Sequence, residues 1–175
     1  KITASEYMSK FARMIRLFLE SSRNKLSPLQ KEIELISIYS SLEKLRFDDK
    51  FDVIINTNDL IEKNILFPTN LLQPFIENAI IHGLVHKTTK GRLDIYFSDK
   101  NDEIYCKIED DGIGRKKSNE MNNNKQRKSL GMEIIQDKII NIENLHDMKI
   151  KIEIIDKNLI THSSEGTIIN LYYKK

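Results

Sequence analysis

Apolar residues recur at helical spacing near the start of the chain. Intervals of three and four residues, with charged side chains between, separate Met8, Phe11, Ile15 and Phe18. This spacing places the apolar side chains on one face of a helix. The pattern predicts an amphipathic helix over residues 5–23.

A second helix is predicted to begin at Ser27. Pro28 suits the first helical position, and Gln30 stands where it would complete a capping box with Ser27 as the N-cap. Apolar residues then continue at helical spacing to about Phe47. Two consecutive amphipathic helices favour a helical hairpin or a dimerising bundle, or they pack on the rest of the domain.

From residue 48 the pattern changes to alternating apolar and polar positions. Helices are predicted over residues 70–83 and 130–144, and a polar loop over 115–129. The predicted strands cover residues 51–57, 91–98, 103–109, 149–155 and 166–173. Hairpin-joined strands with interspersed helices predict an α+β fold, a two-layer sandwich whose mixed sheet carries helices on one face, preceded by two N-terminal helices. We expect a helical region over 1–47 and a second domain over 48–175.

Composition excludes little. A net charge of +2 over 175 residues gives no electrostatic reason to expect a nucleic-acid partner. No apolar run approaches the ~18 residues of a membrane span. The single cysteine, Cys106, lies in a strand pattern and is expected to be a buried hydrophobe rather than a nucleophile. Because the chain begins with Lys1, we expect it to be part of a longer protein.

The predicted helix over 70–83 is apolar but carries polar side chains along one flank. Asn78 and His82 are four residues apart, and Gln73 and Glu77 form a second pair beside them. Burying such groups unpaired costs about 1–3 kcal/mol each. A bound ligand would satisfy them.

Residues 110–114 read Asp-Asp-Gly-Ile-Gly and follow an apolar strand. Asp-Gly pairs mostly form ordinary turns. Here, however, Gly112 and Gly114 would let the backbone approach a ligand, and Asp110 would accept a hydrogen bond from an amine such as that of adenine.

The stretch after these glycines is basic. Against one acid, Glu120, it contains Arg115, Lys116, Lys117, Lys125, Arg127 and Lys128. A mobile basic flap suits a polyphosphate, although a solvated loop has the same composition. Ser129-Leu-Gly131 is expected to open the next helix, whose N-terminal N–H groups would attract an anion. Thr167 offers a hydroxyl at the start of the last strand.

In this order the motifs resemble the ATP-binding domain of sensor histidine kinases, in the gyrase, chaperone, kinase and MutL superfamily that shares the Bergerat fold. Residues 73–83 (QPFIENAIIHG) resemble the N box, 110–114 and 129–131 the two glycine boxes, and Gly166-Thr167 the terminal Gly-Thr. The Gln-Pro and His-Gly of the N box are similar to those of LytS-type kinases. So are residues 7–13 (YMSKFAR) and 42–47 (LEKLRF).

The resemblance implies roles for individual residues. Asn78 would be the Mg²⁺ ligand, and Glu77 would polarise the attacking group or water. Asp110 would bind the amine of adenine, supported by Thr167. His82 would serve the phosphates or cap the helix end.

The resemblance also implies roles for the glycine boxes and for the basic stretch after residue 114, which would form a lid over the nucleotide. Gly112 and Gly114 would let the backbone pass the nucleotide. Gly131 would let the lid helix meet the phosphates, and Lys128 would be one of the lid cations.

Two features depart from the family pattern. Ser129 stands where such kinases usually have glycine, so lid movement or phosphate affinity is expected to differ. The histidines are His82, His86, His146 and His162, and none lies in the first two predicted helices. Residues 5–23 therefore resemble the second half of the dimerisation and phosphotransfer region, with the phosphoacceptor histidine outside this chain.

The expected function is the ATP-binding catalytic portion of a bacterial two-component sensor histidine kinase. It would use ATP and Mg²⁺, form a homodimer through its N-terminal helices and act on a response regulator. The full-length protein would be anchored upstream in the inner membrane, with this part in the cytoplasm and no nucleic-acid partner. A catalytically silent nucleotide-binding or dimerisation module is the alternative. The chain is short for an ATPase clamp of the same superfamily.

Overall fold

The fold is seen in a computed structural model that describes residues 3–59, 65–100, 103–121, 125–146, 148–159 and 165–174. Within these ranges the side chains of residues 58, 100, 119, 125–132 and 146 lie outside the description. In the described part of the chain, no helix is both long and apolar enough to cross a bilayer.

A mixed five-stranded sheet forms one layer of the fold. Its strands stand in the order β2-β4-β5-β7-β6. The strands are β2 (Phe51–Asp59), β4 (Gly91–Lys100), β5 (Glu103–Asp110), β6 (Lys149–Asp156) and β7 (Thr167–Lys174). β2 runs parallel to β4, and the other neighbours are antiparallel. This arrangement confirms the predicted α+β class and the mixed sheet.

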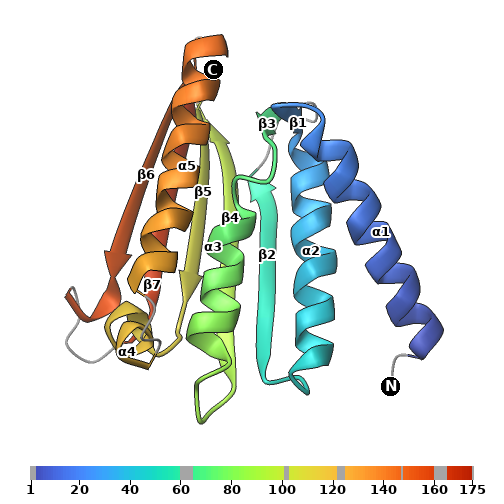
Figure 1. The fold of residues 1–175 in the computed structure, drawn as a ribbon, viewed down its shortest axis with the longest axis vertical. Coiled ribbons are helices and arrows are strands. Elements are labelled where there is room, and N and C mark those ends of the chain that lie inside the picture. The colour runs from blue at the N-terminus through green and yellow to red at the C-terminus, as the bar shows by residue number, and fades with distance from the viewer. Residues whose placement is uncertain are drawn as a thin grey trace.

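Helices form the second layer. Figure 1 shows α3 and α5 on the same side of the sheet, with α2 and α1 further along beside β2. The helices are α1 (Ala4–Ser22), α2 (Leu29–Arg46), α3 (Gln73–Glu77), α4 (Gly114–Met121) and α5 (Lys125–His146). A 3₁₀ turn, η2 (Lys157–Leu159), follows β6.

The core lies between the two layers. β5 alternates strictly, so Ile104, Cys106 and Ile108 point inward. Cys106 is fully buried, and burial raises the pKa of its thiol, which confirms its expected role as a small hydrophobe. Leu29 and Ile36 of α2 belong to the same core, so this helix packs directly on the domain.

The start of α2 differs from the prediction. Ser27 lies in a short strand, β1 (Leu26–Pro28), which pairs antiparallel with β3 (Leu66–Pro68). Pro28 precedes the helix without a side-chain cap, and the Leu29 N–H bonds to the Ile65 carbonyl at 2.8 Å. Pairing between distant segments thus replaced the expected capping box.

The basic stretch over 115–129 is not the predicted loop where the structure describes it. α4 covers residues up to Met121, and α5 begins at Lys125 rather than Leu130. Lys, Arg, Gln and Glu are good helix formers, and this preference favours helices over a loop here. The predicted helix over 130–144 is therefore confirmed, with an earlier start.

The helix expected over 70–83 begins at Gln73 and changes character at Asn78. From there to Leu84 it is a π-helix, η1, and the Val85 N–H bonds to the Ile80 carbonyl, five residues back. Phe75, Ile76 and Ile80 are buried on the sheet side, as their spacing predicted. Such wide turns are frequent at functional sites.

Candidate functional site

A buried carboxylate ends strand β5. Asp110 is 5% exposed, and its Oδ1 accepts a hydrogen bond from the Gly112 N–H at 2.8 Å. Burial raises the pKa of this carboxyl to about 6, although the Gly112 N–H, Lys157 and the Thr167 N–H act in the opposite direction. Asp110 is thus a preorganised hydrogen-bond acceptor at the end of a rigid strand.

Three glycines surround Asp110. A Cβ atom on Gly112 would lie 2.7 Å from both Asp110 Oδ1 and the Gly83 Cα. A Cβ on Gly166, where φ is +115°, would lie 2.9 Å from the Asp110 carbonyl carbon. The end of η1, the loop after β5 and the start of β7 therefore meet in a backbone contact that tolerates no side chain at Gly112 or Gly166.

The close contact changes the expected role of Gly112. The sequence predicted that glycine was needed here to admit a ligand. The space beside Gly112 is instead occupied by Gly83 and Asp110 of the protein itself. Its small size therefore serves the packing of η1 against the loop, and this packing in turn places Asp110 beside the helix.

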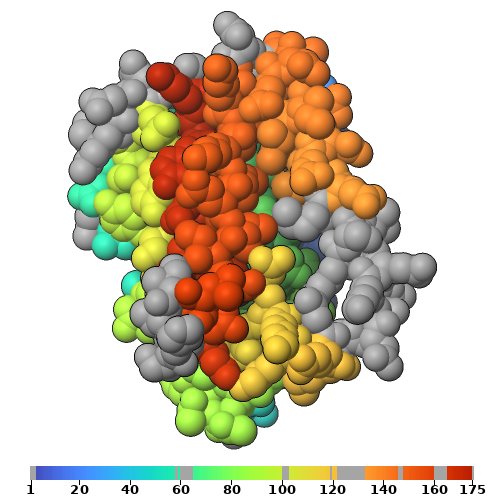
Figure 2. Space-filling view, turned by 90° about the vertical axis from the view of Figure 1, so that its left-hand side faces the viewer, coloured from blue at the N-terminus to red at the C-terminus, as the bar shows by residue number. Residues whose placement is uncertain are grey.

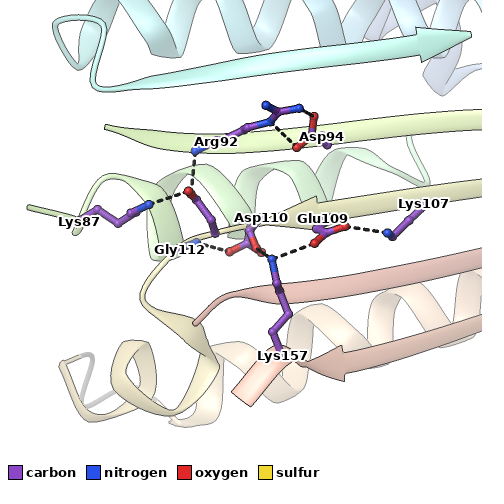
Figure 3. Close-up of polar contacts among 9 residues, drawn as sticks. Lys87, Arg92, Asp94, Lys107, Glu109, Asp110, Gly112 and Lys157 are labelled. Atoms are coloured by element: carbon purple, nitrogen blue, oxygen red, sulfur yellow. Dashed lines mark hydrogen bonds and ion pairs between the residues drawn. The ribbon is translucent and has the colours of Figure 1, made fainter. Parts of the chain in front are cut away.

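Charged side chains brace this end of the sheet. Figure 3 shows Lys157 reaching Glu109 and Asp110, with bonds of 2.8 Å to Glu109 Oε1 and 3.4 Å to the Asp110 carbonyl oxygen. The Asp111 carboxylate binds Lys87 Nζ and the Arg92 N–H, both at 2.7 Å. These bonds join the end of β5 to η2, and the loop after β5 to β4 and to the segment after η1.

Glu77, Asn78 and His82 lie on the α3–η1 helix, but Glu77 and Asn78 are exposed. The expectation that a buried helix flank left them unpaired was wrong, because only the opposite face packs on the sheet. His82 is half-buried. Gln73 Oε1 alone of this polar set is buried with no hydrogen-bond partner among the described residues.

The exposed side of this helix faces the region of α4 and α5. η1 contacts α4. Figure 2 shows atoms of the α3–η1 helix (green) between those of α4 (yellow) and α5 (orange). The structure thus brings Glu77, Asn78, His82, Asp110 and Thr167 to neighbouring elements at one end of the fold.

The other predicted residues are only partly placed. Gly114 has a positive φ of +78° at the start of α4. Lys128 and Gly131 lie within α5, and their side-chain environment is outside the description. Because α5 begins at Lys125, Gly131 is not in the first turn, and the expected anion site at the helix N-terminus moves away from it.

Two basic residues of the predicted flap already have acidic partners. Lys117 pairs with Glu165, and Arg115 lies 3.7 Å from Asp156. Both acids flank the segment between β6 and β7. These exposed pairs are weak and exchangeable, so both cations remain available to a more highly charged anion.

Sequence reasoning missed Gly83 and Lys157 as parts of the site. Gly83 belonged to the quoted His-Gly pair, yet nothing local shows that it meets Gly112. Lys157 follows β6 and is far from Asp110 in the sequence. Only the antiparallel pairing of β6 with β7, and of β7 with β5, brings it there.

The donor set fits a cation that is mainly bound by other ligands. Among the described residues, no three His, Cys, Asp or Glu side chains form a metal cluster. Asn78 offers one exposed amide oxygen, a hard donor suited to Mg²⁺, which usually keeps several waters and substrate phosphates. The residues present are therefore compatible with a metal that arrives with a nucleotide.

Asp110→Asn is expected to stabilise the protein at pH 7.5 by about 1–3 kcal/mol. The folded-state pKa of about 6 lies above the ordinary value of 3.8, so protonation of Asp110 stabilises the fold at low pH. This stabilisation is lost as the pH rises through 6, because the buried carboxyl then ionises. An amide stays neutral and still accepts the Gly112 N–H. Urea unfolding at pH 7.5 and pH 4.5 measures the effect; a gain that is equal at both pH values contradicts it.

The sequence is similar to those of known sensor proteins. A family model described as "Histidine kinase" matches residues 1–51. The chain is 31% identical over 130 residues to the sensor histidine kinase YpdA of Escherichia coli, covering 70% of this chain and 23% of that protein. It is 28% identical over 111 residues to the sensor protein LytS of Staphylococcus haemolyticus, covering 63% and 19%.

A solved structure shares the fold. The histidine kinase AdeS of Acinetobacter baumannii aligns with a TM-score of 0.55 at 16% identity, covering 97% of this chain and 79% of that one. At this identity the likeness concerns the fold alone. The chain spans about a fifth of the length of the two curated relatives.

Proposed function

We propose that this chain, which belongs to the LytS-like sensor histidine kinases, binds ATP beside Asp110 and supplies the catalytic half of a phosphotransfer reaction. One observation carries the proposal: a buried acceptor, Asp110, is packed through Gly112 and Gly83 against the helix that bears Glu77 and Asn78. A hydrogen-bond acceptor for the base and oxygen ligands for the metal and the phosphates would then lie at the two ends of one nucleotide site.

Asp110 would accept a hydrogen bond from the exocyclic amine of adenine. The Gly112 N–H fixes one of its oxygens and Lys157 holds its backbone carbonyl, so the carboxylate needs little reorganisation when the base binds. Thr167, which is buried at the start of β7, would support the same edge of the base. A donor–acceptor pair of this kind favours adenine over bases that present a carbonyl oxygen there.

Mg²⁺ would neutralise charge on the phosphates, and Asn78 would hold it through its amide oxygen. Glu77, which is next to Asn78 and also exposed, would orient or deprotonate the attacking histidine of the phosphoacceptor helix. Lys128 and the lid region with Gly131 would close over the phosphates, and His82 would bind phosphate or cap η1. Gly114 would let the lid begin at the edge of the nucleotide.

The wider setting is also part of the proposal. The ATP γ-phosphoryl would pass to a histidine outside this chain and then to a response regulator. Residues 1–47 would contribute to dimerisation and phosphotransfer, and 48–175 would bind ATP in the cytoplasm beneath an upstream membrane anchor. A homodimer is supported by the exposed apolar stripe of α1, where Met8 is 62%, Phe18 44% and Leu19 57% exposed.

Asp110→Ala is expected to weaken Mg-ATP binding by about 1–3 kcal/mol, or roughly 5- to 150-fold in Kd. The loss follows from removing the acceptor for the base. Titration calorimetry with Mg-ATP and ADP measures it. Asp94→Ala is the matched control, because that carboxylate pairs with Arg92 on the surface at 2.6 Å.

The result decides between functions. Absence of nucleotide heat in the unaltered chain contradicts ATP binding altogether. Binding without transfer, once the phosphoacceptor helix is supplied, favours the catalytically silent module.

A further inference from the structure

Helix α2 places a buried carboxylate against the turn that leads into the α3–η1 helix. Glu32 is only 2% exposed. Its Oε2 accepts the Asn70 N–H at 2.9 Å and its Oε1 accepts the Leu72 N–H at 3.1 Å. Both oxygens of one side chain therefore hold the backbone of this turn, which joins β3 to α3.

The turn has a conformation that needs such support. Asn70 has a φ of +50°, in the left-handed region. The Thr69 N–H and hydroxyl bond to the backbone carbonyls of Lys25 and Asn24, at 3.1 and 2.9 Å, and both carbonyls belong to the connection between α1 and α2. The turn is thus tied to the N-terminal helices at two points.

Helix α5 reaches the same turn from the other side. Lys138 Nζ donates to the Thr69 carbonyl. Burial lowers the pKa of Lys138, while the negative charge of Glu32 acts in the opposite direction. Glu32 and Lys138 therefore hold the same turn, one from α2 and the other from α5.

The held turn leads directly to the proposed catalytic groups. The Leu72 carbonyl accepts the N–H groups of Phe75 and Ile76, and the helix then continues to Glu77 and Asn78. Further along α2, burial raises the pKa of the Tyr39 hydroxyl, and the charges of Glu43 and Glu77 raise it further. The charge of Glu77 thus also acts on a side chain of α2.

We propose that Glu32 is a positioning residue for phosphotransfer: its two hydrogen bonds to the turn before α3 set where Glu77 and Asn78 stand, and so link α2 to the nucleotide site. The inference rests on the proposed function. A shift of α2 relative to the domain would move this turn, and with it the metal-binding and transfer groups, while leaving Asp110 on β5 in place.

The chemistry of the two Glu32 hydrogen bonds favours a role in positioning the turn over a role in stabilising the fold. Burial raises the pKa of Glu32, because ionising the carboxyl is costly where water is excluded. A carboxylate offers two acceptors to two N–H groups in a fixed geometry, and a neutral amide offers one. Glu32→Gln thus releases one end of the turn while keeping the size of the side chain.

The test compares nucleotide affinity with and without Mg²⁺ in the unaltered chain, Glu32→Gln and Glu34→Gln. Glu34 is the matched control on the same helix, since it is partly exposed and binds Arg13 Nε at 2.6 Å. We expect the Mg²⁺-dependent gain in ATP affinity to fall about tenfold in Glu32→Gln, with Mg²⁺-free ADP affinity changed less than about twofold. Glu34→Gln should keep both.

Each outcome is informative. If the unaltered chain binds no nucleotide, the proposed function fails before Glu32 is tested. If it binds, and Glu32→Gln keeps the full Mg²⁺-dependent gain or loses both affinities in proportion to folding stability, Glu32 has only a structural role and the inference is overturned. If Glu32→Gln does not fold, Lys138→Met decides: a smaller loss of the Mg²⁺-dependent gain, about threefold, supports the link, and no loss overturns it.

Discussion

Gly166→Ala is expected to cost roughly 3 kcal/mol or more of folding stability, the largest effect of any single methyl group at this site. Two causes act together. The φ of +115° is a conformation that side-chain-bearing residues rarely adopt, and the new Cβ would lie 2.9 Å from the Asp110 carbonyl carbon and 3.0 Å from the Asp111 Cα. These neighbours are backbone atoms of β5 and its following loop, so they cannot rotate away.

Gly114→Ala is the matched control for this prediction. Gly114 also has a positive φ, +78°, but its Cβ would meet, within the described part of the chain, only the Gly166 nitrogen at 3.6 Å. We expect a cost of about 1 kcal/mol from the backbone alone. Urea unfolding of the two variants separates backbone strain from the steric conflict with Asp110. Equal losses of unfolding free energy would show that the backbone at Asp110 moves to accommodate the new methyl group.

The predictions that the structure confirmed depend on local pattern. Alternation placed Ile104, Cys106 and Ile108 on one face of β5 because side-chain direction in a strand repeats every two residues. The buried face of the α3–η1 helix followed from helical spacing in the same way. The end of β5 at Asp110 was predictable for the same reason, since the Asp-Gly pair terminates the alternation.

What the sequence did not predict depends on contacts between distant segments. Ser27 pairs across β1 and β3 instead of capping α2, and Gly83 meets Gly112 only because η1 ends above the loop after β5. The bonds of Glu32 to Asn70 and Leu72 are of the same kind. Each of these contacts fixes part of the site, and none leaves a periodic signal.

The basic stretch shows a different limit. Its charge suggested a mobile loop, whereas its residue types favour helices, and α4 and the early start of α5 follow the second property. Helical α4 holds Arg115 and Lys117 near Asp156 and Glu165. The lid function proposed for this region therefore concerns the movement of helices rather than the ordering of a coil.

Asn78→Ala is expected to reduce Mg²⁺-dependent phosphotransfer by on the order of 100-fold or more, because a metal that stabilises transferring phosphate is worth several kcal/mol. Stability should barely change, since Asn78 is exposed and its backbone bonds within the helix remain. The assay follows labelled phosphate from ATP to a supplied phosphoacceptor helix.

Two measurements make the Asn78 prediction specific. Mg²⁺-free ADP affinity should stay within about twofold of the unaltered chain, because Asp110 and the three glycines around it do not involve Asn78. An equal loss of Mg²⁺-free ADP binding would instead make Asn78 a nucleotide contact rather than a metal ligand. Glu77→Gln completes the comparison: it should lower the rate of transfer while the Mg²⁺-dependent gain in ATP affinity persists, because the two adjacent side chains would then serve different steps on one helix.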